Sequence, residues 1–135
     1  MNKGFSLLEL LITMVIVSIL SSLAVPSYRR YIKKARYQEI LQSTLIYQLG
    51  IEECYQNLGN FDYCNAGENS IPNRYQSDQS LINTIDVQKG IITVTPNNYQ
   101  GIQNTDTYIL TPQINSLDQI QWLKSGGALE KGYTH

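Results

Sequence analysis

The sequence predicts an α+β fold in which one long N-terminal helix packs, along its second half, on an antiparallel sheet of about four strands. Three observations support this class. An apolar run at residues 5–25 carries a single charge. A stretch with helical periodicity follows that run as far as residue 55. Alternating apolar and polar residues at 81–124, separated by short turn sequences, are typical of strands.

The apolar run is long enough to cross a membrane as a helix. A rise of 1.5 Å per residue carries about 20 residues through roughly 30 Å of hydrocarbon. Its apolar side chains point in all directions around a helix, as expected for a segment surrounded by lipid or by other apolar helices. An ordinary secretory signal has its cleavage site after the apolar core, whereas the small residue Gly4 precedes it. Cleavage at Gly4 would therefore retain the helix.

Glu9 is the only charged residue of that run. An acid near the centre of a bilayer costs on the order of 2.5 to 3.5 kcal/mol, so its presence points to a function. The alternative is that Glu9 lies close enough to the helix end to reach lipid headgroups. Cleavage after Gly4 would give Phe5 a free amino group one helical turn from Glu9. These two charges could pair within one chain or between neighbours, and pairing between neighbours would set their axial register.

Residues 4–10 read GFSLLEL and open the apolar helix, which is followed by Pro26-Ser27-Tyr28. This arrangement resembles the class III leader and the N-terminal helix of type IV pilins. The resemblance implies a type IV pilin fold with three parts. Residues 1–4 would be a leader peptide, residues 5–26 the helix that anchors the precursor and later lies in the filament core, and residues 27–135 the head.

The resemblance also implies roles for single residues. A prepilin peptidase would cleave between Gly4 and Phe5 and methylate the new Phe5 amino group. Glu9 would then pair with that amino group on an adjacent subunit during assembly. The sequence has serines at positions 18, 21 and 22, where the family usually has one glycine and two alanines.

Pro26 ends the apolar run and is expected to bend the helix. A proline removes one backbone hydrogen bond and clashes with the preceding turn. Serine hydroxyls that bond back to helix carbonyls can loosen the same region. The sequence therefore predicts a kink near Ser22–Pro26 in the isolated subunit.

Cys54 and Cys64 are the only cysteines and would close a short loop. A disulfide there would stabilise the head by roughly 2 to 3 kcal/mol and would require an oxidising compartment. The alternative is two free buried thiols. The charges flanking the span indicate the opposite location for the head. More basic residues follow the span than precede it, and a simple count of these charges would place the head in the cytoplasm. The cysteine pair and the resemblance favour a head outside the cytoplasm, and we predict that side.

Charge is shared unevenly along the chain. From Tyr37 onward four basic residues oppose ten acidic ones, a net charge of −6, which disfavours general DNA binding by the head. Lys124 and Lys131 form the one small patch where a ligand such as DNA could still bind. The cluster of basic residues directly after the span is expected to meet lipid headgroups before assembly or acids of neighbouring subunits afterwards, the alternative being a solvated helix face. They are Arg29, Arg30, Lys33, Lys34 and Arg36.

The head is expected to contain four parts in order. An amphipathic helix continues to residue 55, a loop occupies 56–80, an antiparallel sheet occupies 81–124, and a flexible tail occupies 125–135. The predicted strands are 81–87, 90–95, 107–111 and 119–124. The helix arc expected to face the sheet comprises Tyr28, Tyr31, Ala35, Leu41, Leu45 and Leu49, with Thr44 on the opposite side. The sheet residues expected to face the helix are Ile85, Val87, Ile92, Val94, Tyr108, Leu110, Ile120 and Trp122.

We expect no enzymatic activity, cofactor or metal, because the sequence contains one histidine, His135, and no zinc, phosphate-loop or nucleophile motif. The resemblance implies a structural subunit of a type IV pilus that serves adhesion, twitching motility or DNA uptake. Its partners would be other copies of itself, minor pilins, the prepilin peptidase and the bacterial inner membrane, from which it passes to an extracellular filament. The alternatives are a type II secretion pseudopilin, or a minor pilin whose head binds DNA or a surface ligand.

Overall fold

A computed structural model of the chain describes residues 3–134. The chain divides into two compact units, residues 1–32 and 33–135. Met1 and Asn2 of the predicted leader and His135 of the predicted tail lie outside the described residues. The elements are α1 (Leu7–Ser43), α2 (Leu45–Leu58), β1 (Tyr75–Gln76), β2 (Ile82–Gln88), β3 (Ile91–Pro96), β4 (Tyr108–Ile114), β5 (Ile120–Ser125) and α3 (Gly127–Glu130).

The first unit is the apolar part of α1, and its large apolar side chains are exposed. Among the described residues, one helical stretch, Leu7–Leu58, contains a segment long and apolar enough to cross a membrane. Two of its serines bond back to the helix: Ser18 donates to the Met14 carbonyl at 2.8 Å and Ser22 to the Ile19 carbonyl at 2.7 Å. The helix runs through Pro26 without ending there, and the kink at Pro26 stays a prediction.

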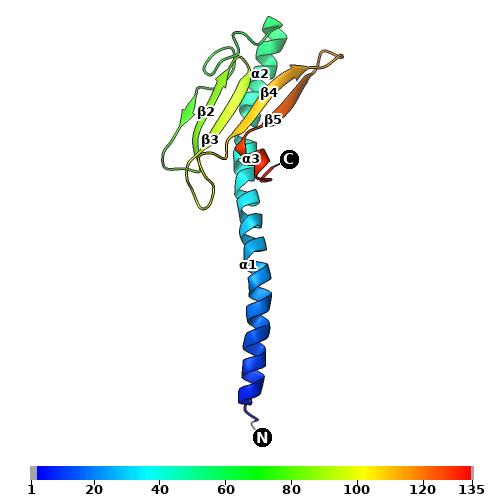
Figure 1. Cartoon of the computed structure of the whole chain (residues 1–135). Coiled ribbons are helices and arrows are strands. Elements are labelled where there is room, and N and C mark those ends of the chain that lie inside the picture. Colours follow the sequence, from blue (N-terminus) through cyan, green and yellow to red (C-terminus); the bar gives the residue numbers. More distant parts are fainter. Residues whose placement is uncertain (1–2, 135) are drawn as a thin grey trace. The chain divides into compact units, whose positions relative to one another are not determined.

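The sheet has five antiparallel strands in the order β1-β2-β3-β4-β5, so each strand pairs with the next one in the chain (Figure 1). The four predicted strands are all present. The fifth, β1, was missed because it has only two residues, Tyr75 and Gln76, which pair with Ile85 and Thr84. So short an edge strand has no alternating pattern from which a sequence could predict it.

One face of the sheet forms the core of the head together with α2 and the end of α1 (Figure 1). The prediction of which sheet residues face inward is confirmed for β2, β3 and β4, whereas the two positions on β5 are only partly buried. Trp122 packs against the core from this outer strand. The buried residues are Ile85, Val87, Ile92, Val94, Tyr108 and Leu110.

The predicted helix face is wrong. Leu45 and Leu49 are exposed, as are Tyr28, Tyr31 and Ala35, and only Leu41 of the predicted arc packs against the core. The helices instead bury Tyr37, Ile40, Thr44, Tyr47, Ile51 and Cys54. This face contains polar atoms, but each hydroxyl finds a partner inside the head, so its burial leaves no unpaired donor.

Three hydrogen bonds satisfy the hydroxyl groups that this helix face buries in the core. Tyr37 donates to the Asp106 carbonyl and Tyr47 to the Asn73 carbonyl, both at 2.9 Å. Thr44, which was predicted to be on the polar side, donates to the Leu41 carbonyl at 2.7 Å. Thr44 also separates α1 from α2, and α2 then ends at Leu58, where Gly59 adopts a left-handed conformation with φ of 74°.

The tail is packed on the head, in contrast to the predicted flexible segment. Ala128 in α3 is fully buried, and its amide donates to the Thr107 carbonyl at 3.2 Å. A side chain at Gly126 or Gly127 would collide with the backbone of residues 105–107. Glycines in the sequence indicated a flexible tail, but in the structure they allow the tail backbone to approach residues 105–107 closely.

Candidate functional site

The predicted processing site is accessible in the structure. Gly4 has no atom within 4 Å of the position where a side chain would begin, and Phe5 is exposed. α1 begins two residues later, at Leu7. The peptide bond between Gly4 and Phe5 therefore lies ahead of the helix, in a segment without helix or strand, where a protease can reach it.

Ser6 and Glu9 form a reciprocal cap at the start of α1. The Ser6 amide donates to the Glu9 carboxylate at 3.0 Å, and the Glu9 amide donates to the Ser6 hydroxyl at 3.2 Å. This is the capping box, which satisfies two of the amides that a helix leaves free at its N-terminus. The spacing Ser-x-x-Glu ahead of an apolar run signals it in the sequence, and sequence reasoning missed it. The Glu9 carboxylate is thereby bound to the amide of Ser6, the residue that follows Phe5.

The predicted disulfide between Cys54 and Cys64 is confirmed, with an S–S distance of 2.06 Å. It links α2 to the loop that follows. The Cys64 carbonyl accepts a hydrogen bond from Gly90 at 2.8 Å, and the Asn65 side chain accepts one from the Lys89 amide at 2.9 Å. Lys89 and Gly90 lie in the turn between β2 and β3. The disulfide therefore links α2 to that hairpin through Cys64 and Asn65.

Lys131, one half of the predicted ligand patch, forms an ion pair inside the head. Its ammonium lies 2.5 Å from the carboxylate of Asp106, which is fully buried. The other Asp106 oxygen accepts a hydrogen bond from the Gln103 amide at 2.9 Å. The hydrogen bond to Asp106 raises the pKa of Lys131. The patch formed by Lys124 and Lys131 stays a prediction, and Lys131 is held by the head itself.

Tyr37 lies at the centre of the same cluster. Burial raises the pKa of its phenol, and the charge of Asp106 adds to the effect. Its ring contacts Tyr108 on β4 edge to face, with centroids 6.2 Å apart, and Tyr133 of the tail at 6.0 Å. The end of α1, the loop before β4 and the tail therefore meet around Tyr37.

The basic residues at the base of the head fall into two groups. Lys33 lies against Gly101, and the Arg36 guanidinium lies over the Tyr99 ring at 6.0 Å, so both are engaged by the loop between β3 and β4. The other three are exposed, and no ion pair with them is found among residues 3–134. They are Arg29, Arg30 and Lys34.

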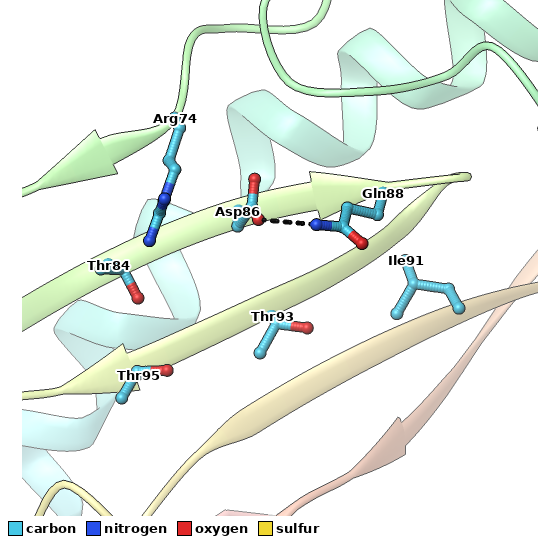
Figure 2. A pocket seen from close by; sticks show the side chains of 7 residues that line it. All are labelled: Arg74, Thr84, Asp86, Gln88, Ile91, Thr93 and Thr95. Carbon is cyan, nitrogen blue, oxygen red and sulfur yellow. Dashed lines mark hydrogen bonds between the residues drawn. The ribbon is translucent and has the colours of Figure 1, made fainter.

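The outer face of the sheet carries an open hollow of about 360 Å³. Figure 2 shows Arg74 extending over β2 beside Thr84, while the Gln88 side chain donates to the Asp86 carboxylate at 3.3 Å. The lining residues are Arg74, Thr84, Asp86, Gln88, Ile91, Thr93 and Thr95. Within the described part of the chain no group of three or more His, Cys, Asp or Glu could hold a metal ion.

Comparisons with known proteins agree with the N-terminal geometry and the fold. The family model "Prokaryotic N-terminal methylation motif" matches residues 1–25. The solution structure of the major type IV pilin PpdD from enterohemorrhagic Escherichia coli has a similar fold, with a TM-score of 0.58 and 24% identity. The similarity covers 76% of this chain and 79% of that one.

Three curated relatives are similar in sequence. Prepilin peptidase-dependent protein D of Escherichia coli K12 is 32% identical over 82% of this chain and 73% of its own length. Type IV pilus subunit protein TapA of Aeromonas hydrophila is 41% identical over 53% of this chain and 50% of its own length. Type IV major pilin protein PilE1 of Neisseria gonorrhoeae is 31% identical over 72% of this chain, which spans 54% of its length. The chain belongs to the type IV pilin family.

Proposed function

We propose that the chain is a structural subunit of a type IV pilus. In this proposal it enters the bacterial inner membrane as a precursor, loses residues 1–4 to a prepilin peptidase, and is N-methylated at Phe5. It then polymerises with other copies and with minor pilins through its N-terminal helix into an extracellular filament. The filament would serve adhesion, twitching motility or DNA uptake, and its subunit would act structurally rather than as an enzyme.

One observation carries the proposal, namely the contrast between the two units. The head has its own core and a disulfide, whereas the first unit exposes nearly all its large apolar side chains. So large an apolar surface requires lipid or other apolar helices around it. The capping box binds the Glu9 carboxylate to the amide of Ser6, the residue after Phe5, and this supports pairing with a Phe5 amino group once Gly4 has been removed.

The proposal is tested by mass spectrometry of filaments sheared from cells. We expect an abundant peptide that begins at N-methylated Phe5. Replacing Gly4 with a larger residue should leave the leader attached and abolish filaments, and normal fibres from such a strain would contradict the processing step. A Glu9→Ala strain should still insert and cleave the chain but assemble poorly, whereas wild-type piliation would refute the role of Glu9.

The same measurement separates the two alternative functions. Processed chain found only in the membrane fraction would favour a type II secretion pseudopilin. Processed chain present in filaments at a small fraction of another pilin would favour a minor subunit. The disulfide and the long loop after α2 favour the pilus over the pseudopilus.

A further inference from the structure

The open hollow on the outer face of the sheet is built from three cross-strand pairs of β2 and β3. Directly opposed residues of an antiparallel pair have their Cβ atoms about 5 Å apart, and the next pair on the same face lies about 7 Å further along the strands. The lining side chains therefore form a regular grid, and Arg74 extends over β2 beside Thr84 (Figure 2). We call this site the Arg74 hollow. Its pairs are Thr84 with Thr95, Asp86 with Thr93, and Gln88 with Ile91.

The Arg74 guanidinium is a cation that the head does not use. Its side chain is exposed, and no ion pair or hydrogen bond with it is found within residues 3–134. Asp86 lines the same hollow, but its carboxylate accepts hydrogen bonds from the Val87 amide at 2.9 Å and from the Gln88 side chain at 3.3 Å. A guanidinium presents five N–H donors in a plane and binds a carboxylate through two parallel hydrogen bonds. Arg74 is therefore free to bind a carboxylate from outside the chain.

The hydroxyls of the Arg74 hollow also have no partner within the head. Thr84, Thr93 and Thr95 are partly buried, and no hydrogen bond from their hydroxyls is found in the part of the chain that the structure describes. Each hydroxyl can donate one hydrogen bond and accept two. The Asp86 carboxylate offers about four acceptor positions, of which two are occupied. The hollow thus combines one cation, three unused hydroxyls and a carboxylate that can accept further hydrogen bonds.

We propose that the Arg74 hollow binds an acidic saccharide, that is, a sugar that carries a carboxylate. The sugar carboxylate pairs with the Arg74 guanidinium at the end of the hollow beside Thr84. Sugar hydroxyls donate to Asp86 and exchange hydrogen bonds with the threonine hydroxyls. The inference goes beyond the proposed function, because it assigns the head a ligand of its own and does not require the filament.

The lining of the Arg74 hollow disfavours other classes of ligand. Protein interfaces derive most of their binding energy from buried aromatic and other large side chains, whereas Ile91 is the one large apolar residue of the lining and is 38% exposed. Nucleic acids and anionic membranes need several cations, and among the lining residues Arg74 is the one cation.

The proportion of charge to hydroxyl fits an acidic sugar better than a small anion. A free phosphate brings charge that the Asp86 carboxylate repels, and it leaves most of the threonine hydroxyls unused. A uronic acid residue brings a single carboxylate together with several hydroxyls. The volume of about 360 Å³ also lies in the range of sites for small ligands.

Titration of the full-length chain in detergent micelles tests the inference, with tri-galacturonate as the probe. A polyoxyethylene ether is the suitable detergent, because it carries neither sugar nor charge. Nuclear magnetic resonance of the isotope-labelled chain should show shifts of backbone amides in β2 and β3, with a dissociation constant of about 1 mM for so open a site. The methyl-esterified trisaccharide keeps the ring hydroxyls but lacks the charge, and it should bind about tenfold more weakly.

Variants with matched controls assign the binding to the hollow. Arg74→Gln should weaken tri-galacturonate binding about tenfold. Arg30→Gln removes the same charge from the first unit and should bind like the wild type. Thr95→Val removes one hydroxyl at nearly constant volume and should weaken binding severalfold. Thr111→Val makes the same change on β4, outside the hollow, and should have no effect on binding.

Four results would overturn the inference. They are the absence of shifts at about ten times the expected dissociation constant, equal binding of the methyl ester, equal weakening by Arg30→Gln and Arg74→Gln, and the same amide shifts with inorganic phosphate at the same concentration. Equal binding of the ester would mean that Arg74 does not recognise the carboxylate. Equal weakening by the two arginine variants would mean general attraction of the probe to positive charge. The phosphate result would mean a site for any anion.

The titration separates this inference from the proposed function, because it uses chain that has not assembled. Wild-type chain that forms filaments but gives no shifts overturns the saccharide site and leaves the subunit role intact. Wild-type chain that binds the probe but is absent from sheared filaments supports the site and contradicts the subunit role. A lower filament yield of Arg74→Gln, with unchanged binding of tri-galacturonate, would assign the hollow to a contact between subunits and overturn the inference.

Discussion

Substitutions on the two sides of α2 should change the free energy of unfolding by very different amounts. Ile51 is fully buried in the core, whereas Leu49, two positions earlier, is 66% exposed. Ile51→Ala removes three buried carbon atoms and leaves a cavity, which typically costs about 2 to 5 kcal/mol. Leu49→Ala removes the same number of atoms from the surface and should change the free energy of unfolding by less than about 0.5 kcal/mol.

These values translate into a large difference in melting temperature. For a head of this size each kcal/mol shifts Tm by roughly 4 to 8 °C, so that Ile51→Ala should lower Tm by about 10 °C or more. Leu49→Ala should leave Tm within a few degrees of the wild type. The assay is thermal unfolding of the full-length chain in detergent micelles, followed by near-ultraviolet circular dichroism of its tyrosines and tryptophan.

The periodicity of the sequence alone predicted the opposite outcome. It placed Leu45 and Leu49 against the sheet, so Leu49→Ala would then create the cavity. A Leu49→Ala variant less stable than Ile51→Ala would therefore refute the buried face described here. Equal and small effects from both variants would show that α2 does not contribute to the core.

Three further predictions concern the head. Replacing Cys54 and Cys64 with alanine removes a disulfide between residues 10 positions apart, which should lower the free energy of unfolding by about 2.7 kcal/mol in the chain-entropy description. Thermal unfolding with and without reductant measures this loss, and a wild type whose Tm is unaffected by reductant would contradict it. Gly50→Ala should destabilise the head because its new methyl group would lie 2.8 Å from the Ser70 carbonyl, and an unchanged Tm would contradict that packing. Because folding raises the pKa of Lys131, its ion pair stabilises the head fully below the unfolded pKa, and this stabilisation disappears as the pH rises through the folded pKa. The stabilities of the wild type and of Lys131→Met should therefore converge above about pH 10.5. A difference in stability that stays constant with pH would refute the ion pair.

The sequence by itself determined the class of fold and the processing motif. Composition separates lipid-facing from water-facing segments, so the apolar run follows from residue types. Strict alternation in the strands requires one buried face, which is why the inward residues of β2, β3 and β4 were predicted correctly. The cysteine pair was also found, because only two cysteines are present.

Only the tertiary structure decided which side of the helix faces the sheet, and how the tail and the charged residues are used. Two apolar arcs were available on the helix, and the predicted one contains three leucines, whereas the buried one contains none. The other arc is buried because Asp106 and Asn73 supply carbonyl partners for Tyr37 and Tyr47, partners far away in sequence that no local pattern reveals. The packing of Gly126 against residues 105–107 depends likewise on a distant backbone. Local composition fixes how apolar a segment is, but the choice between competing contacts depends on which distant groups meet it in the folded chain.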